Sequence, residues 1–347
     1  MAVTKRSFDT LADGRAVEIY SMTNRNGMCV EVMTYGANIV NLFLPGQNHE
    51  KVDVTLGYDS IEPYTVNMDN FGATIGPNCN RIADASFMLE GKKVQMAVND
   101  GVNNLHSDAC LSTTKRIWDA QATQDSVIFT VKMNDGEVGL PGNKIIRLTY
   151  TLTDDNELRL HYEGKSDKNT IINLTNHAYF NLSGHAAGSI HDSILWVNAS
   201  RFTEVRKGGI PTGKILPVKG TALDFTEPKS IGRDIDGDDP QTKLVGGYDH
   251  NWVLDGWDGQ VRLAARLTDE KAKRQMEVYT NLPGIQIYAG NFIGKQQAKD
   301  GAVYGPRMGI AMETQYFPDA PNHDNFPSTV FGPERQYDST TIYKFIY

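Results

Sequence analysis

Short runs in which hydrophobic and polar residues alternate recur along the chain, and most of them end at Gly, Asn or Asp. Alternation with a period of two is typical of a β-strand, whereas the period of an amphipathic helix is scarce in this sequence. The clearest runs predict strands at Ala16–Met22, Met28–Tyr35, Ser126–Met133, Lys144–Leu152 and Leu158–Tyr162. The pattern therefore predicts an all-β fold.

Turn-forming residues separate neighbouring runs. Residues 153–157 are Thr-Asp-Asp-Asn-Glu, so the runs on either side of them are predicted to pair as an antiparallel hairpin. Turn residues also precede strands predicted at Val261–Leu267 and Ile285–Tyr288. Since the sequence contains no flexible linker, fixed-period repeat or low-complexity tract, residues 1–347 are expected to form a single domain.

Composition adds the class of protein and excludes some partners. Hydrophobic residues make up 40% and charged residues 22% of the chain, as in an ordinary soluble globular protein. The formal charge of −8 opposes binding to nucleic acid or to an anionic membrane surface, so neither is expected as a partner. No stretch approaches the ~20 apolar residues of a membrane helix. The polar start Met1–Phe8 does not resemble a secretory signal.

The cysteines bear on the compartment. Cys29, Cys79 and Cys110 are far apart and odd in number, which is not typical of a disulfide framework. Free thiols fit a reducing environment, so a cytoplasmic location is expected.

Three features that suggest a bound ion or phosphate do not fit in detail. The acidic stretch 234–239 lacks the Gly and Glu that a calcium loop needs at its sixth and twelfth positions, so we expect a solvated loop. Residues 208–214 nearly match a phosphate-binding loop, but Pro interrupts them and Ile follows where Ser or Thr is required. His177, His185 and His191 lack metal-ligand spacing, and no metal is expected.

Candidate chemistry first appears in residues 173–182, which separate at the period of a strand into a polar and a mostly apolar face. The polar face carries Asn173, Thr175, His177, Tyr179 and Asn181. These groups donate or accept hydrogen bonds without a full charge, which suits a neutral polyhydroxylated ligand such as a sugar. A plain solvent-facing strand explains the same pattern equally well.

Residues 308–315 present a second candidate strand. Bulky Met308, Ile310 and Met312 share one face, and Glu313 shares the other with small residues and Gln315. A carboxylate beside small residues is compatible with a general base in a cleft, although an exposed Glu is the commoner case. The polar clusters 78–81, 103–106 and 248–250 are equally ambiguous when each is taken alone.

Taken together and in order, these segments resemble the galactose mutarotase, or aldose 1-epimerase, family, from about Val17 to Tyr347. The matching pieces are Thr34–Ala37, Ile75–Pro77, Asn80–Ile82, Asn104–His106, Asp135–Glu137 with Leu140–Gly142, Asn176–Leu182, Gly220–Thr221 with Leu223–Phe225, Tyr248–His250, Pro283–Gln286 with Gly290–Phe292, and Glu313–Gln315. The resemblance implies a large antiparallel β-sandwich, the galactose mutarotase-like supersandwich, with an open sugar-binding cleft. It implies an enzyme that interconverts the α and β anomers of free aldohexoses such as galactose and glucose without a cofactor.

The resemblance also implies roles for four residues. Glu313 is similar to the general base that removes the proton of the C1 hydroxyl, and His177 to the acid that protonates the ring oxygen. The ring then opens to an aldehyde and closes again on the other face. Arg81 and His106 match residues near the ring oxygen and C1, where a positive charge or a hydrogen bond stabilises developing negative charge.

Four further residues are implied as sugar contacts. Asn80, Asp249 and Gln286 match positions that bind sugar hydroxyls, and Tyr179 is a neighbouring candidate. With these assignments the expected substrate is a small aldose.

This chain departs from the family at two places. Residues 76–79 are Gly-Pro-Asn-Cys where Gly-Arg is usual before the Asn-Arg pair, and Ser107-Asp108 replace a Gly-Gly after His106. Glycine permits backbone conformations that Ser and Asp resist, so we expect a differently shaped loop after His106. Asp108 is a candidate contact for a substrate hydroxyl. These changes bear on sugar preference more than on the reaction, because the acid and base motifs are intact.

Other functions remain open at this point. A non-catalytic sugar-binding protein on the same scaffold is the main alternative, since a fold alone does not fix activity. A glycoside hydrolase needs Asp249 and Glu313 roughly 5–10 Å apart across a glycosidic bond. A phosphosugar epimerase has less support, because apart from Arg81 the motif positions contain no cluster of basic residues to bind a phosphate. Edge strands are compatible with a monomer or a homodimer.

Overall fold

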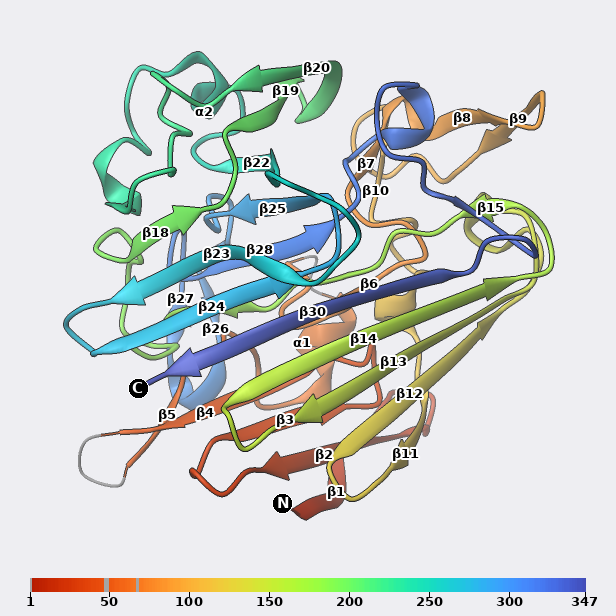
Figure 1. The fold of residues 1–347 in the computed structure, drawn as a ribbon. Coiled ribbons are helices and arrows are strands. Elements are labelled where there is room, and N and C mark those ends of the chain that lie inside the picture. The colour runs from red at the N-terminus through yellow and green to blue at the C-terminus, as the bar shows by residue number, and fades with distance from the viewer. Residues whose placement is uncertain (1, 47–49, 67–68) are drawn as a thin grey trace.

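The computed structural model describes residues 2–46, 50–66 and 69–347 (Figure 1). Its largest sheet has nine antiparallel strands, which is the all-β arrangement that the alternation predicted. In spatial order they are β11 (Asp119–Ala122), β12 (Ser126–Met133), β13 (Lys144–Leu152), β14 (Glu157–Ser166), β30 (Tyr337–Ile346), β24 (Arg274–Thr280), β23 (Arg262–Asp269), β18 (Ile194–Val197) and β21 (Lys229–Ser230).

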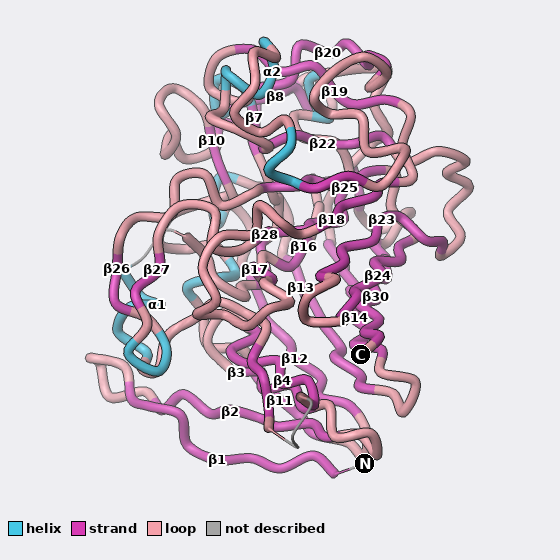
Figure 2. Tube along the Cα trace, turned by 90° about the vertical axis from the view of Figure 1, so that its left-hand side faces the viewer, coloured by secondary structure: helices cyan, strands magenta, loops and turns pink. Residues whose placement is uncertain are grey.

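Two further sheets complete the main framework. A six-stranded sheet has the order β17 (Tyr179–Phe180), β28 (Ile310–Gln315), β25 (Gly284–Tyr288), β22 (Asp249–Val253), β19 (Arg201–Arg206) and β20 (Ile210–Pro217). A five-stranded sheet runs in chain order through β1 (Ala2–Thr10), β2 (Ala16–Thr23), β3 (Cys29–Met33), β4 (Ile39–Pro45) and β5 (Lys51–Asp53). Figure 2 shows the six-stranded sheet beside the nine-stranded one, with β1 and β2 at the base.

The remaining elements are short. Two-stranded pairs are β6 (Thr74–Ile75) with β16 (Thr175–Asn176), β7 (Arg81–Ile82) with β10 (Asn104–Leu105), β8 (Ser86–Leu89) with β9 (Lys92–Gln95), β15 (Thr170–Ile171) with β29 (Val330–Phe331), and β26 (Gln296–Gln297) with β27 (Val303–Tyr304). The described helices are α1 (Ile61–Val66), α2 (Pro240–Leu244) and the 3₁₀ turns η1 (Ala83–Ala85), η2 (Thr113–Lys115), η3 (Glu137–Gly139), η4 (Ile231–Arg233), η5 (Lys299–Gly301) and η6 (Ala320–Asn322). None of the helices described is long and apolar enough to cross a membrane.

The predicted hairpin at residues 153–157 is confirmed. β13 and β14 pair antiparallel with Leu152 opposite Leu158, and residues 144–152 alternate between buried and more exposed positions. Their inward-facing side chains join one hydrophobic core with residues of the other two large sheets, among them Leu42 and Met312. Packing the sheets against one another buries the apolar face that each sheet has, as in a β-sandwich.

Residues 173–182 correct one prediction. They do not form a single strand, because β16 pairs with β6 and β17 pairs with β28, and the chain changes partner at His177 and Ala178. All ten residues are buried, so the solvent-facing interpretation of this segment is wrong. The amides at its two ends bind backbone carbonyls, Asn173 that of Tyr316 and Asn181 that of Met308, and so hold the segment in place.

The acidic stretch 234–239 is a loop, as predicted, in which residues 236–238 are exposed and Ile235 is buried. Its carboxylates make local contacts instead of converging on one point. Asp234 pairs with Lys229 at 2.7 Å, Asp236 pairs with Arg307 at 2.7 Å, and Asp239 accepts hydrogen bonds from the first turn of α2. An N-terminal cap of this kind satisfies backbone donors that the helix itself cannot.

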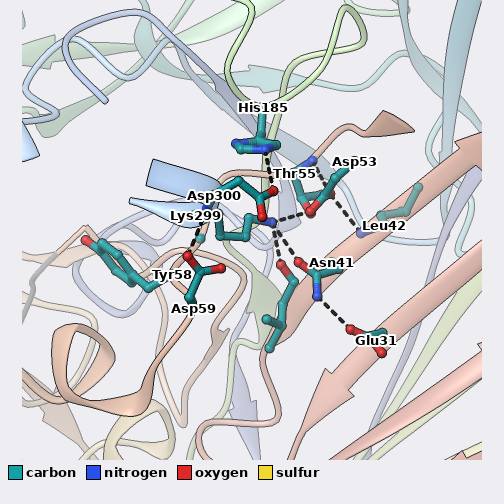
Figure 3. A network of polar contacts seen from close by, with 12 residues as sticks. Glu31, Asn41, Leu42, Asp53, Thr55, Tyr58, Asp59, His185, Lys299 and Asp300 are labelled. Carbon is teal, nitrogen blue, oxygen red and sulfur yellow. Dashed lines mark hydrogen bonds and ion pairs between the residues drawn. The ribbon is translucent and has the colours of Figure 1, made fainter. Parts of the chain in front are cut away.

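A buried ion pair fastens the β26–β27 hairpin to the five-stranded sheet (Figure 3). The ammonium of Lys299, on η5 between the two strands, donates to the carboxylate of Asp53 at 2.5 Å, to the side chain of Asn41 at 3.0 Å and to the carbonyl of Val40 at 2.8 Å. The three acceptors of the ammonium, Val40, Asn41 and Asp53, are not among the predicted site residues.

Candidate active site

A cleft of about 370 Å³ opens against the six-stranded sheet. This volume lies near the lower end of the range for small-molecule pockets. Its lining includes predicted site residues Asn80, Arg81, His106, His177, Tyr179, Asp249 and Glu313. The structure therefore brings together side chains that are spread over more than half of the sequence.

Three adjacent strands of the six-stranded sheet position the carboxylates. Glu313 lies on β28 directly opposite Gln286 of β25, and β25 in turn pairs with β22, which begins at Asp249. Gln286 does not line the cleft, but its amide donates to the carboxylate of Asp249 at 2.7 Å. Gln286 thus orients Asp249, and its direct contact with a sugar hydroxyl stays a prediction.

The two-stranded pair β7–β10 places the cationic side of the cleft. Arg81 lies opposite Leu105, and His106 follows at the end of β10. The guanidinium of Arg81 is 3.6 Å from the carboxylate of Asp249. Burial lowers the pKa of Arg81, but the nearby carboxylates of Asp249 and Asp100 outweigh it and the net direction is upward. Arg81 therefore remains a cation.

The backbone fixes the protonation pattern of His106. The N–H of Asn80 donates to Nδ1 of His106 at 3.1 Å, while the N–H of His106 donates to the carbonyl of Asn80 at 3.1 Å. Burial, with His177 and Arg81 nearby, holds the pKa of His106 well below its usual value, so the ring is neutral. A neutral ring whose Nδ1 accepts a hydrogen bond carries its proton on Nε2. His106 therefore presents an N–H donor.

His177 and Glu313 form a buried pair in the cleft. Nε2 of His177 lies 3.5 Å from Oε1 of Glu313, and the two side chains are 7% and 2% exposed. The ring of His177 also packs against Tyr179, with centroids 5.0 Å apart, and edge-on to His106 at 5.4 Å. The alternative in which Glu313 is an exposed surface residue is therefore wrong.

Burial shifts both members of this pair toward their uncharged forms. It lowers the pKa of His177 to about 4. It raises the pKa of Glu313 well above the usual value, and the negative charge of Asp249 adds to the increase. These directions favour a protonated Glu313 beside a neutral His177, and transfer of that one proton to His177 turns Glu313 into a carboxylate and His177 into an imidazolium. The pair is thus equipped to supply one acid and one base.

Both residues also have buried atoms without a partner. Nδ1 of His177 and Oε2 of Glu313 have no hydrogen-bond partner among the described residues. An unpartnered buried polar atom costs roughly 1–3 kcal/mol, and most native proteins satisfy nearly all of them. Two of them on one contact pair, beside an open cleft, indicate a site prepared for a polar ligand.

The two departures from the family sequence contact each other. Ser107 adopts a left-handed backbone with φ 69°, where glycine is favoured, and its hydroxyl bonds both the N–H and the carbonyl of Asn78 at 2.9 Å. Asp108 lines the cleft and also accepts from the N–H groups of Cys110 and Leu111. The side chain of Ser107 therefore compensates for a conformation that residues other than glycine resist.

Several lining residues were not predicted from the sequence. They are Asp69, Asn70, Asn99, Leu105, Ala109, Ser112, Thr114, Lys115, Tyr288 and Phe292. Tyr288 ends a predicted strand two residues beyond Gln286, so strand alternation could have placed it near the cleft. Lys115 and Asp69 lie in loops and turns that no motif singled out, and only the folded chain brings them to this place.

Three side chains with metal-ligand atoms also converge here. His106, His177 and Glu313 place such atoms within 4.8 Å of one another, although their sequence spacing gives no metal motif. The tautomer of His106 opposes their use as a metal site. Its Nδ1 lone pair already accepts the N–H of Asn80, and its Nε2 carries the proton. Hydrogen bonding to an organic ligand fits the group better.

Comparisons with known proteins agree with this geometry. The model of the aldose 1-epimerase family matches residues 18–344. The chain is 36% identical to galactose mutarotase of Bos taurus over 346 residues, covering 99% of each chain. It is 34% identical to aldose 1-epimerase of Escherichia coli strain K12 over 337 residues, covering 96% of each.

Solved structures show the same architecture. Galactose 1-epimerase from Lactobacillus acidophilus superposes with a TM-score of 0.87 at 28% identity, covering 100% of this chain and 99% of that one. An aldose epimerase homologue from C. elegans gives a TM-score of 0.86 at 28% identity, covering 94% and 98% of the two chains. The predicted antiparallel supersandwich is confirmed.

Proposed function

The chain belongs to the aldose 1-epimerase family, and from this premise we propose that Glu313 and His177 carry out its proton transfers. The protein is an isomerase that interconverts the anomers of an aldose. The observation that supports the assignment is the buried contact between His177 and Glu313, 3.5 Å apart, with one atom on each that has no hydrogen-bond partner in the described part of the chain. The non-catalytic alternative does not explain why a titratable pair is buried among the residues that line the cleft.

The reaction follows from moving one proton on each side of the anomeric carbon. The carboxylate of Glu313 takes the proton of the C1 hydroxyl, and protonated His177 gives its proton to the ring oxygen as the bond from C1 to that oxygen breaks. The product is an open aldehyde. Rotation about the C1–C2 bond and reclosure with both transfers reversed give the other anomer. Acid–base catalysis of this kind contributes about 10²–10⁴-fold.

Arg81 and His106 stabilise the charge that develops during ring opening. Arg81 supplies a cation, and His106 supplies an N–H donor. Because Nδ1 of His106 accepts from Asn80, the proton is on Nε2, where it is available to a ligand in the cleft. Preorganised donors of this kind usually provide the largest electrostatic contribution to catalysis. Asn80, Tyr179 and Asp249 line the same cleft and are proposed to bind sugar hydroxyls.

We propose neutral aldohexoses, galactose and glucose, as the preferred substrates. The curated relatives include galactose mutarotases, and the charged lining of the cleft opposes an anionic sugar. Apart from Glu313, whose raised pKa favours the neutral form, three acidic residues line it against two basic ones: Asp69, Asp108 and Asp249 against Arg81 and Lys115. The ammonium of Lys115 already donates to the carbonyls of Tyr64 and Thr65. A phosphate would therefore meet more repulsion than attraction.

Polarimetry tests the proposal directly. Freshly dissolved α-D-galactose and α-D-glucose are followed with native protein, with Glu313→Gln and with His177→Asn, at a pH where spontaneous mutarotation is slow. We expect acceleration by native protein only. Glucose 6-phosphate should react more slowly than glucose, and aryl glycosides should not be cleaved. Full activity of both variants would contradict the assignment, and release of an aryl group would favour the hydrolase alternative.

A cytoplasmic location is proposed on the state of the cysteines. Cys29 and Cys79 are buried and free, and Cys110 is exposed and free. An exposed free thiol is stable in a reducing compartment. Cell fractionation that recovers the protein outside the cytoplasm would overturn this proposal.

A further inference from the structure

A second carboxylate, that of Asp100, contacts Arg81 through a different nitrogen from the one nearest Asp249. Nε of Arg81 donates to Oδ2 of Asp100 at 3.0 Å, whereas its terminal nitrogen NH1 lies 3.6 Å from Asp249. The side chain of Arg81 is 17% exposed. Asp100 does not line the cleft, although its neighbour Asn99 does. Arg81 is thus the lining residue whose side chain Asp100 binds directly.

The turn that carries Asp100 is itself well fixed. Asp100 and Asn103 exchange backbone hydrogen bonds in both directions, at 3.1 and 2.9 Å. The side chain of Asn103 accepts the N–H of Asp84, and the amide of Asn99 bonds both the N–H and the carbonyl of Leu105. Leu105 is the residue paired with Arg81 across β7 and β10. The carboxylate is thus anchored to the strand pair that presents Arg81.

A glycine restrains the face of the same guanidinium. A Cβ atom built on Gly209 would lie 3.1 Å from Cζ of Arg81, so the turn between β19 and β20 packs directly on the planar group. Asp100 at one edge and Gly209 on the face leave little freedom for rotation. An Arg fork donates along fixed directions, so its orientation decides which oxygen it can reach.

We propose that Asp100 is a positioning residue for the epimerase reaction, which orients Arg81 toward the developing negative charge of the opening ring. The inference rests on the role proposed above for Arg81. It also explains why an ion pair that is partly open to solvent, with Asp100 34% exposed, sits on a turn with so many internal bonds.

The test is a double-mutant cycle. The rate of galactose mutarotation is measured for Asp100→Ala, for Arg81→Ala and for the double variant, together with Asp100→Asn, which retains a neutral acceptor. Asp100→Ala should lower kcat about tenfold with a smaller change in KM, because misplaced catalytic groups lose rate steeply. In the Arg81→Ala background the same change should have less than about a twofold effect. Asp100→Asn should recover part of the loss.

Asp154→Ala is the matched control. Asp154 also accepts from Nε of an arginine, Arg25, at 2.6 Å, and its side chain is 27% exposed. Its removal should leave the rate unchanged within about twofold, as expected for a surface pair.

Two results would overturn the inference, and they can be told apart. If Arg81→Ala is inactive while Asp100→Ala and Asp100→Asn are fully active, the positioning role is wrong and the role of Arg81 stands. If Arg81→Ala is fully active, the assignment of Arg81 is wrong and the inference is overturned with it. Equal losses from Asp100→Ala in both backgrounds would indicate a merely structural role and would also overturn it.

Discussion

Two buried pairs of titratable side chains in this protein are similarly buried but differ in how fully their polar atoms are hydrogen-bonded. Lys299 and Asp53 have side chains that are 3% and 5% exposed, and those of His177 and Glu313 are 7% and 2% exposed. The three N–H groups of the Lys299 ammonium have three acceptors, as Figure 3 illustrates. Nδ1 of His177 and Oε2 of Glu313 have none among the described residues.

The difference shows that burial by itself does not identify a functional group here. Asp53 uses one oxygen for Lys299 and the other for the N–H groups of Leu42 and Thr55 and the hydroxyl of Thr55. That cluster has no capacity left for a ligand, whereas the cleft pair keeps donors and acceptors that a sugar can satisfy. We therefore expect the first pair to determine stability and the second to determine activity.

The largest effect that separates the two is expected for Glu313→Gln. The change keeps the shape of the side chain and removes the base, so the rate of mutarotation should fall by about 10²–10⁴-fold. Because burial raises the pKa of Glu313, the neutral amide should not lower the free energy of unfolding. Polarimetry and urea unfolding of one preparation measure both quantities. A large loss of stability without a loss of rate would mean that Glu313 determines stability and not activity, contrary to this expectation.

Lys299→Met tests the other pair. It leaves the carboxylate of Asp53 buried without its cation, which typically costs about 3–5 kcal/mol of unfolding free energy. The rate per folded molecule should stay near that of native protein. Lys271→Met is a matched control, because Lys271 also lies 2.5 Å from its partner Asp192, but these side chains are 81% and 78% exposed. An equal loss in the control would show that burial is not the cause.

The sequence predicts these regions unequally. Strand alternation located the β13–β14 hairpin, and it placed Glu313 on a strand, because both signals are local. It could not show that Glu313 is buried, since that depends on how distant strands pack over it. The break at His177, which arises because β16 and β17 pair with different partners, was also missed.

Contacts between distant residues were the least predictable. A lysine in a turn is normally expected at the surface, and nothing near Lys299 in the sequence indicates that Asp53 will meet it. Asp100 and Lys115 belong to no recognised motif and reach the site only through the fold. The resemblance to a known family supplied the roles of His177 and Glu313, which periodicity alone left open.

The acid dependence of stability gives a smaller effect that separates His177 from exposed histidines. The folded protein binds a proton at His177 only near pH 4, whereas the unfolded chain binds one near pH 6.5. Stability is therefore lost as pH falls from about 6.5 to about 4, by roughly 1.4 kcal/mol per pH unit for this group. Glu313, with its pKa raised, contributes in the opposite direction, so the experiment is made in the Glu313→Gln variant.

In that background His177→Asn should reduce the slope of unfolding free energy against pH by about one proton. Urea unfolding at several values between pH 4.5 and 6 measures the slope. His161, which is exposed on β14 beside Asp338, provides the control as His161→Asn. An unchanged slope in the His177 variant would mean that His177 is already protonated in the folded protein.

Asp300→Asn should have the smallest effect on unfolding free energy, because it removes only an exposed charge next to Lys299. Asp300 lies 3.3 Å from Nε2 of His185 but is 79% exposed, and such pairs contribute about 0–1 kcal/mol. Asn also tolerates the left-handed backbone found at this position, φ 53°, and the N–H bond to Asp59 remains. Unfolding free energy and mutarotation rate should both stay close to those of native protein. A loss of unfolding free energy as large as that of Lys299→Met would show that the exposed carboxylate of Asp300, and not the buried one of Asp53, provides the stabilising charge. The comparison between the fully hydrogen-bonded pair and the cleft pair would then not explain the stability of this region.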